Sequence, residues 1–182
     1  MRFGGMLTAT LILLLGACDA SSDTATPREP AASSDSPAPT ATVPTMPAQA
    51  AEDSSEGAAA FVKYYVDVFN YAAATGDVDE LSRLSSPDCD GCQSYIDLYR
   101  DTYKAGGYFK GGDWQMGDLQ LETRSNESLA TTRVTSDQSK FRKSRDFAEE
   151  TGKGTNTELT FVVSPPNPDR QVTGLRLSGE KS

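Results

Sequence analysis

The sequence contains no histidine and is poor in positive charge. Catalytic arrangements of the Ser-His-Asp and Cys-His kinds need an imidazole, as do the usual hydrolytic zinc sites, so these enzyme classes are excluded. The chain has 17 basic and 26 acidic residues, which gives a net charge of −9. Because nucleic-acid binding depends on positive charge that neutralises phosphate, we exclude that function too.

Long apolar runs are also missing. The apolar segment Leu7–Leu15 is too short for a permanent transmembrane helix, which needs about 20 residues. Arg2 precedes this segment, and the small residues Gly16 and Ala17 follow it. This is the pattern of a removable export signal, so we predict a signal peptide over residues 1–17.

Cys18 directly follows the small pair, and Leu15-Gly16-Ala17-Cys18 resembles the lipobox of bacterial lipoprotein precursors. The resemblance implies that a diacylglyceryl group is attached to the Cys18 sulfur and that Cys18 becomes the mature N-terminus. Two acyl chains would anchor the protein stably, since each buried methylene contributes about 0.8 kcal/mol. We therefore expect the protein on the extracytoplasmic face of the cell membrane. The alternative is a secreted protein in which Cys18 is incidental.

Residues 18–56 have the composition of a disordered linker. They are rich in Ala, Ser, Thr, Pro and Asp, and large apolar side chains are nearly absent. Such a segment buries too little apolar surface to offset the entropy lost on ordering. Its length gives a mean reach of roughly 35 Å as a flexible coil. We expect a tether that holds a domain away from the membrane.

Residues 57–182 are long enough for a single domain, which begins with helices. A first helix is predicted over 57–74, with Ser54 or Ser55 as its cap and Gly76 at its end. A capping box at Asp77–Glu80 predicts a short second helix that ends near Leu84. A third is predicted over 93–105, with an apolar face formed by Tyr95, Leu98, Tyr99 and Tyr103.

In the rest of the domain, apolar and polar residues alternate with a period of two, which is typical of antiparallel strands. Strands are predicted near 113–123, with a bulge at Gly117-Asp118, and over 128–135, 157–164 and 171–177. In the strand over 157–164, Leu159, Phe161 and Val163 are predicted to face inward. The polar segment 137–154 fits either a long hairpin loop or a ragged edge strand. Helices followed by strands predict an α+β domain, with N-terminal helices packed on a curved antiparallel sheet.

Several short motifs in this domain resemble a family of actinobacterial lipoproteins of unknown function. They are Phe61-Val-Lys-Tyr-Tyr, Asn70-Tyr-Ala, Thr75-Gly-Asp, Cys89-x-x-Cys92, Gly106-Gly and Gly111-Gly-x-Trp114. The family's domain is similar to the cone-shaped fold of nuclear transport factor 2 and SnoaL-like proteins. The resemblance implies fold and location only, because this fold carries enzymes, ligand binders and interaction modules.

Cys89 and Cys92 are the most specific internal motif. In an exported protein they can remain oxidised, and a structural disulfide is the expected state. A redox site or a pair of free thiols are the alternatives. Redox chemistry is disfavoured because no strand precedes the pair, and because the nearby Asp88, Asp90 and Asp97 oppose a thiolate. Zinc would need further ligands, so no metal is expected.

A group of tyrosines and carboxylates has the residue types of a pocket. A buried carboxylate among them could act as an acid or base. The alternative is that the aromatic residues form the core and the acids are solvated. The candidate pocket residues are Tyr64, Tyr65, Asp67, Asp97, Tyr103 and Trp114.

A basic cluster, Lys140, Arg142, Lys143 and Arg145, stands out in this acidic chain. It could contact an anionic lipid or a wall polymer, or it could be a solvated loop. Asn126-Glu-Ser128 matches a glycosylation sequon, and we interpret it as a turn.

We therefore expect a lipid-anchored extracytoplasmic protein that binds a cell-envelope protein or a small ligand, without catalysis and without a cofactor. The alternative is a SnoaL-like enzyme or a small-ligand carrier with a Tyr/Asp-lined pocket. A deep cavity with buried Asp67 or Asp97 would favour the alternative. A core filled by Phe, Tyr and Trp114 would favour binding.

Overall fold

A computed structural model describes residues 41–167 and 169–177. These residues belong to one compact unit, 39–182. The predicted signal peptide, Cys18 and the first part of the predicted linker lie outside the described residues.

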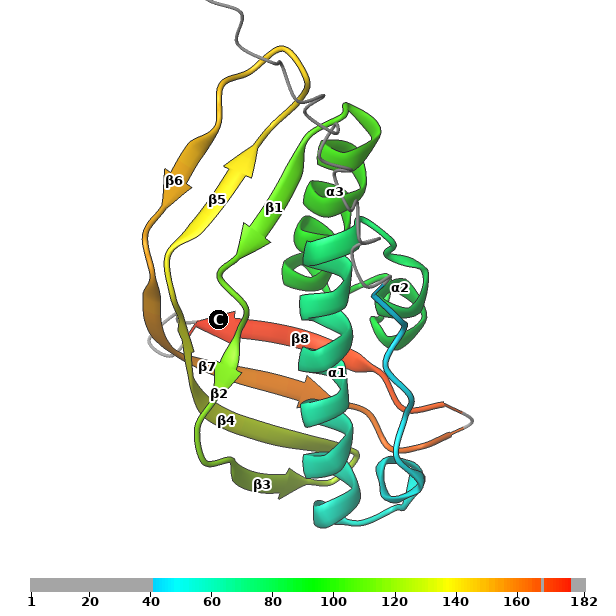
Figure 1. Cartoon of the computed structure of the whole chain (residues 1–182). Helices are drawn as coiled ribbons and strands as arrows, with labels where there is room; N and C mark the ends of the chain where they lie inside the picture. Colours follow the sequence, from blue (N-terminus) through cyan, green and yellow to red (C-terminus); the bar gives the residue numbers. More distant parts are fainter. Residues whose placement is uncertain (1–40, 168, 178–182) are drawn as a thin grey trace, which may run out of the picture. The chain divides into compact units, whose positions relative to one another are not determined.

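The helices come first in the chain (Figure 1). A 3-10 helix, η1 (Ala48–Ala51), precedes α1 (Ser55–Thr75), α2 (Asp79–Leu84) and α3 (Asp90–Lys104). The predicted caps of α1 are confirmed: the Ser54 side chain accepts a hydrogen bond from the Gly57 N–H, and Gly76 closes the helix with a φ of 76°.

The packed structure begins before residue 57, inside the segment assigned to the linker. Ala50 of η1 is fully buried in the core beside α1. The two helices approach so closely that a Cβ on Gly57 would lie 2.2 Å from the Glu52 carbonyl oxygen. Glycine is therefore required at this position for steric reasons, although it is a poor helix former.

The main sheet has five antiparallel strands. They are β2 (Gln115–Met116), β3 (Gln120–Arg124), β4 (Glu127–Ser136), β7 (Thr155–Val163) and β8 (Val172–Leu177). Their order is β2-β4-β7-β8, and β3 also pairs with β4. Between β2 and β3, residues 117–119 oppose residues 132–133, which confirms the predicted bulge.

A second sheet was not predicted. It has three strands in the order β1-β5-β6: β1 (Tyr108–Gly111), β5 (Ser139–Arg142) and β6 (Glu150–Gly152). Of the two predictions for 137–154, the ragged strand is therefore nearer to the structure. Figure 1 shows β4 continuing into β5, and β6 into β7, as one long bent hairpin. At the bend a Cβ on Gly154 would lie 2.6 Å from the Ser136 carbonyl oxygen, so the close approach requires glycine.

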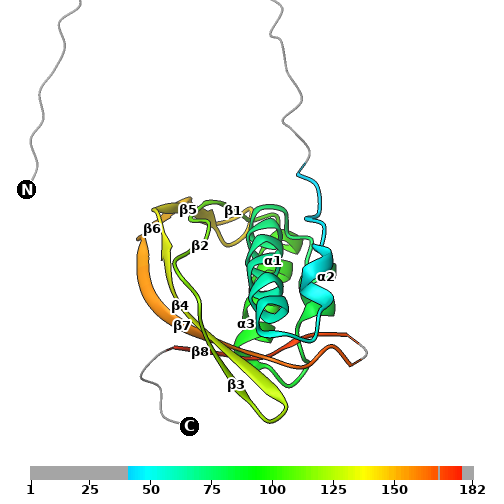
Figure 2. The ribbon, with the colours of Figure 1, turned by 90° about the horizontal axis from the view of Figure 1, so that it is seen from below.

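The helices pack against one side of the sheets (Figure 2), which confirms the α+β class. The core lies between α1 and the inward residues of β7, including Phe161 and Val163, as predicted. The face predicted for α3 was wrong at Leu98, which is 47% exposed. Its buried face runs through Cys92, Ile96 and Tyr99, which are spaced i, i+4 and i+7, and Leu98 lies one residue off this row.

Candidate functional site

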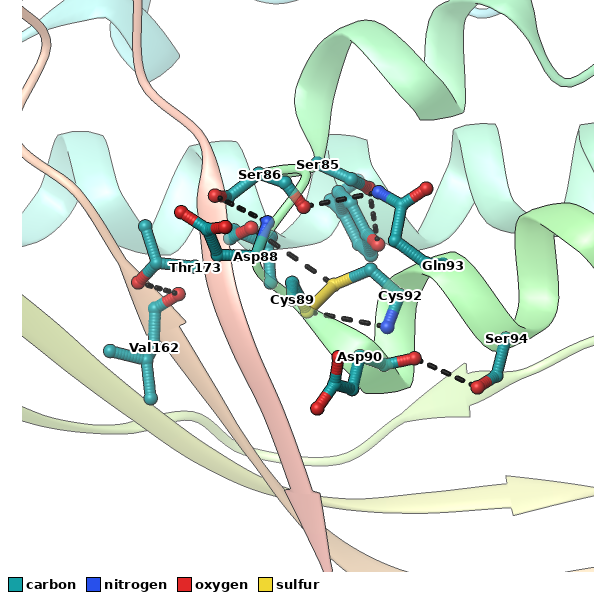
Figure 3. The surroundings of a disulfide bond; sticks show 12 residues. Ser85, Ser86, Asp88, Cys89, Asp90, Cys92, Gln93, Ser94, Val162 and Thr173 are labelled. Atoms are coloured by element: carbon teal, nitrogen blue, oxygen red, sulfur yellow. Dashed lines mark hydrogen bonds between the residues drawn. A yellow bond between two sulfur atoms is a disulfide. The ribbon is translucent and has the colours of Figure 1, made fainter.

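The predicted disulfide between Cys89 and Cys92 is present and lies at the start of α3 (Figure 3). Cys89 is the N-cap, and its sulfur accepts a hydrogen bond from the Cys92 N–H at 3.3 Å. Gly91, between them, lies so close to β8 that a Cβ would be 2.9 Å from the Leu175 carbonyl oxygen. Both cysteines are 1% exposed, so a thiol of another protein has no direct access to the bond. This burial favours a structural role.

Tyr64 contacts α2 rather than a cavity. Its hydroxyl donates to a Glu80 oxygen at 2.5 Å, and Arg83 donates to both oxygens of that carboxylate. Burial and the Glu80 carboxylate raise the pKa of Tyr64 to about 12, and the hydrogen bonds from Arg83 lower the pKa of Glu80. Glu80 is therefore held by Arg83 and does not complete the predicted capping box.

Tyr65 is a buried core residue. Its ring packs edge-on against Phe161 of β7, and its hydroxyl lies 3.0 Å from the Ser85 hydroxyl. The Ser85 hydroxyl donates its hydrogen to the Leu81 carbonyl, so Tyr65 is the donor in this pair. Burial raises the pKa of Tyr65 to about 12.

Trp114 lies in an aromatic cluster between the helices and the two sheets. It stacks on Phe69 of α1 with ring centroids 4.0 Å apart, and Tyr95 of α3 packs edge-on against both rings. Phe69 also contacts Tyr99, which in turn packs against Phe109 of β1. Large rings therefore occupy the space in which a pocket was considered.

The remaining candidates point elsewhere. The Tyr103 hydroxyl donates to the Ala73 and Ala74 carbonyls at the end of α1. Asp67 is exposed on α1, and the Asp97 side chain is 56% exposed and pairs with Arg100. The six candidate pocket residues thus do not surround one cavity.

A polar hollow of about 330 Å³ lies where three segments meet: the start of α1, the β3–β4 turn and the β7–β8 loop. The predicted turn at Asn126 is confirmed and forms one wall. The lining is rich in hydroxyl groups and carries two acidic and two basic residues. It comprises Asp53, Ser54, Ser55, Thr123, Arg124, Ser125, Asn126, Glu127, Ser128, Pro165 and Arg170.

Arg170 is the most unusual residue of this hollow. It is 6% exposed, and its Nη2 donates to the Glu52 carbonyl oxygen at 2.5 Å. Its Nε is buried and finds no acceptor among the described residues. Burial lowers the pKa of the guanidinium, and the nearby Asp53 acts in the opposite direction. A second hollow of about 140 Å³, beneath η1, is also lined by Arg170.

Sequence reasoning did not find Arg170. It lies near the end of the proline-rich β7–β8 loop, directly after Asp169, and no apolar pattern around it predicts burial. Its role depends on Glu52, which is far away in the sequence but adjacent in the fold.

These features define a class of protein: an α+β domain with a buried internal disulfide, an aromatic core and a polar hollow at one end. The chain belongs to the family of unknown function DUF6318, whose match covers residues 29–163. No curated protein matches the sequence.

Solved structures similar to this chain share its fold at low sequence identity. The intermembrane-space region of the chloroplast protein ARC6 matches with a TM-score of 0.50 and 10% identity, over 69% of this chain and 97% of that one. A putative dehydratase of the NTF2-like family, from Streptomyces avermitilis, matches with a TM-score of 0.40 and 17% identity, over 66% of this chain and 95% of that one. An uncharacterized protein with a cystatin-like fold, from Caulobacter vibrioides, matches with a TM-score of 0.41 and 9% identity, over 65% of this chain and 87% of that one.

Among the described residues, no helix is both long and apolar enough to cross a membrane.

Proposed function

We propose that the protein is a lipid-anchored binding protein of the extracytoplasmic membrane face, and that it holds a polar partner group in the hollow beside Arg170. The proposed location rests on Leu15-Gly16-Ala17-Cys18 and on the linker that follows. The proposed activity is binding without catalysis.

The observation that carries the binding proposal is the incompletely paired guanidinium of Arg170. A buried polar group without a partner costs about 1–3 kcal/mol, and more when it is charged. The Nε itself is enclosed by protein, so a ligand in the hollow would offset this cost by accepting from the other N–H groups of the guanidinium. Because the lining balances two acidic and two basic side chains and is rich in hydroxyls, a neutral or mildly acidic polar group suits it, such as a peptide carboxamide or a sugar.

The aromatic cluster supports binding rather than catalysis. A carboxylate becomes a useful acid or base when burial shifts its pKa. Asp67 and Asp97, the two carboxylates considered for that role, are both exposed. Trp114, Phe69 and Tyr95 occupy the space between the helices and the sheets.

The anchor is tested by intact mass spectrometry of protein purified from membranes, without reduction and with alkylation of free thiols. A diacylglyceryl mass on Cys18 and no alkylated thiol are expected. An unlipidated Cys18 would contradict the proposed location, and two alkylated thiols would reopen the redox interpretation of Cys89 and Cys92.

The hollow is tested by photo-crosslinking in cells. A photoreactive residue replaces Asn126, which lines the hollow, or Asn156, an exposed residue of β7 that does not. We expect a discrete adduct at position 126 but not at 156, and its loss when Arg170→Met is added. Equal adducts at both positions, or an adduct unaffected by Arg170→Met in a folded variant, would contradict the proposed site.

A further inference from the structure

Positive charge is concentrated in one part of this acidic domain. Residues 104–111 and 139–153 contain seven lysines and arginines and three acidic residues. The rest of the described chain contains seven basic and eighteen acidic residues. Such a separation produces a local positive potential, although the protein as a whole is negative.

The fold brings six of these seven cations together from the end of α3, from β1, and from β5 with the loop after it. In the register of β1 and β5, Tyr108 lies opposite Arg142 and Lys110 opposite Lys140. These four side chains share one face of the sheet, since side chains alternate along each strand. Lys110 and Arg142 lie over the Tyr108 ring at 4.5 and 4.9 Å from its centroid.

The loop after β5 is tied to the end of α3. The Arg145 N–H donates to the Ala105 carbonyl at 3.0 Å, and Arg142 Nη2 donates to the Gly106 carbonyl at 3.1 Å. Figure 1 shows the end of α3, the start of β1 and the β5–β6 turn at the same end of the domain. We call this surface the basic end and define it by Lys104, Lys110, Lys140, Arg142, Lys143 and Arg145.

The positive charge of the basic end is only partly neutralised. Lys140 pairs with Glu149 at 3.0 Å, and Lys143 with Glu150 at 3.6 Å. Within residues 41–167 and 169–177, Lys104, Lys110 and Arg145 have no carboxylate within ion-pair distance. These three cations are available to an external anion.

The same turn carries an exposed aromatic residue. Phe147 is 57% exposed, and a hydrogen bond of 3.1 Å from its N–H to the Ser144 carbonyl closes the turn. An aromatic ring beside Lys and Arg matches the interface of an anionic bilayer, where headgroups attract the cations and the acyl boundary accepts the ring. An anionic polymer in water would use the cations but would give Phe147 no apolar contact.

We propose that the basic end docks on the surface of an anionic phospholipid bilayer, with the β5–β6 turn at the interface. The proposal rests on the proposed function, because the lipid anchor on Cys18 brings the domain to the membrane. It adds a second, electrostatic contact that orients the domain.

The test uses the lipidated mature chain in vesicles that contain quencher-bearing lipids. A fluorophore is attached through Ser144→Cys in the β5–β6 turn or, as a control, through Ser94→Cys. Ser94 is exposed on α3, ten residues and thus about 15 Å before Lys104. The vesicles contain phosphatidylcholine alone, or equal parts of phosphatidylcholine and phosphatidylglycerol.

We expect quenching at position 144, but not at 94, in the phosphatidylglycerol vesicles, and its loss at high salt. Lys143→Glu with Arg145→Glu should abolish it. The matched reversal Lys63→Glu with Arg133→Glu, at exposed positions on α1 and β4, should leave it unchanged.

Several results would overturn the proposal. Equal quenching at both positions would mean that the tether alone holds the domain near the lipid. Quenching that persists in phosphatidylcholine or after the Lys143 and Arg145 reversals would exclude an electrostatic contact. If Cys18 carries lipid but position 144 is not quenched, the docking proposal fails and the anchored protein stands. If Cys18 carries no lipid, both proposals fail.

Discussion

The side chain of Asn70 joins α1 to the segment before β2, and its replacement by aspartate gives a sharp test of the structure. Asn70 Nδ2 donates to the Trp114 carbonyl at 3.0 Å, and Asn70 Oδ1 accepts from the Trp114 N–H at 2.8 Å. The amide thus forms the same two hydrogen bonds with the Trp114 backbone that a residue of a neighbouring strand would form. It holds Trp114 against Phe69 in the aromatic cluster.

Asn70→Asp keeps the acceptor but replaces the donor with a charged oxygen. The Trp114 carbonyl loses its donor and is left half-buried without a partner, which costs about 1–3 kcal/mol, and the introduced charge faces it. We expect a loss of about 2–3 kcal/mol in the free energy of unfolding at pH 7. With a urea m-value of about 2 kcal/mol/M, the midpoint should fall by about 1 M or more.

The deficit should shrink in acid. The introduced carboxylate faces a carbonyl oxygen when folded, so its folded pKa lies above its unfolded value of about 3.9. A group with a raised folded pKa contributes stability below its unfolded pKa and loses it as the pH rises through the folded value. At pH 4 the protonated oxygen can donate to the Trp114 carbonyl.

The assay is urea unfolding at pH 7 and pH 4, followed by the fluorescence of Trp114, the single tryptophan of the chain. Asn156→Asp, at an exposed position on β7, is the matched control. A loss below about 0.5 kcal/mol, within the range of ordinary surface substitutions, would refute the hydrogen-bond geometry. So would a deficit that is the same at both pH values and in the control.

Three further predictions concern stability. Cys89→Ala with Cys92→Ala should lower the free energy of unfolding by roughly 2 kcal/mol in urea titrations, because the disulfide closes only a very short loop in the unfolded chain. An unchanged midpoint would contradict this. Gly57→Ala should lower the melting temperature in calorimetry, because its Cβ would lie 2.2 Å from the carbonyl oxygen of Glu52. This holds although alanine favours helices over glycine by about 1 kcal/mol. A higher melting temperature would contradict the close packing of η1 on α1. Tyr64 and Tyr65 have pKa values of about 12 when folded, against about 10 when unfolded. The free energy of unfolding should therefore be constant just below pH 10 and decline between pH 10 and 12, in urea titrations followed by circular dichroism. Tyr65→Phe should reduce this decline.

Elements with local signals could be predicted from the sequence. The bounds of α1 follow from a Ser54 cap and a Gly76 terminus, and both residues act on backbone groups only a few positions away. The inward residues Leu159, Phe161 and Val163 of β7 follow from their spacing of two, although Val162 between them is buried as well. In each case the determining residues lie within the element or next to it.

The second sheet could not be predicted because its signals are not local. β1 has four residues, the last of which is a glycine, and it pairs with residues of β5 that lie 28 to 34 positions later. β5 contains one large apolar residue, Phe141, which is too few to give an alternating apolar pattern. The face of α3 was predicted incorrectly at Leu98 because the tyrosines alone were used to place it, whereas Cys92 and Ile96 also lie on the buried side.

The hollow and its buried arginine depend on tertiary contacts even more strongly. Arg170 is buried because Glu52, the β3–β4 turn and the β7–β8 loop meet around it. The sequence around residue 170 contains no pattern that predicts these contacts. The disulfide could be predicted because the two cysteines lie within one helical turn.

The two proposed contacts lie at opposite ends of α1. The helix begins at the hollow and ends at Gly76, where a Cβ would touch the ring of Tyr103, the neighbour of Lys104 in the basic end. Its 21 residues span about 31 Å. A domain that rests on the bilayer through its basic end would therefore hold the hollow roughly that far from the surface, open to a partner in the envelope. If so, Lys143→Glu with Arg145→Glu should release the domain from lipid without reducing crosslinking at position 126. Loss of both together would place the partner at the membrane surface instead.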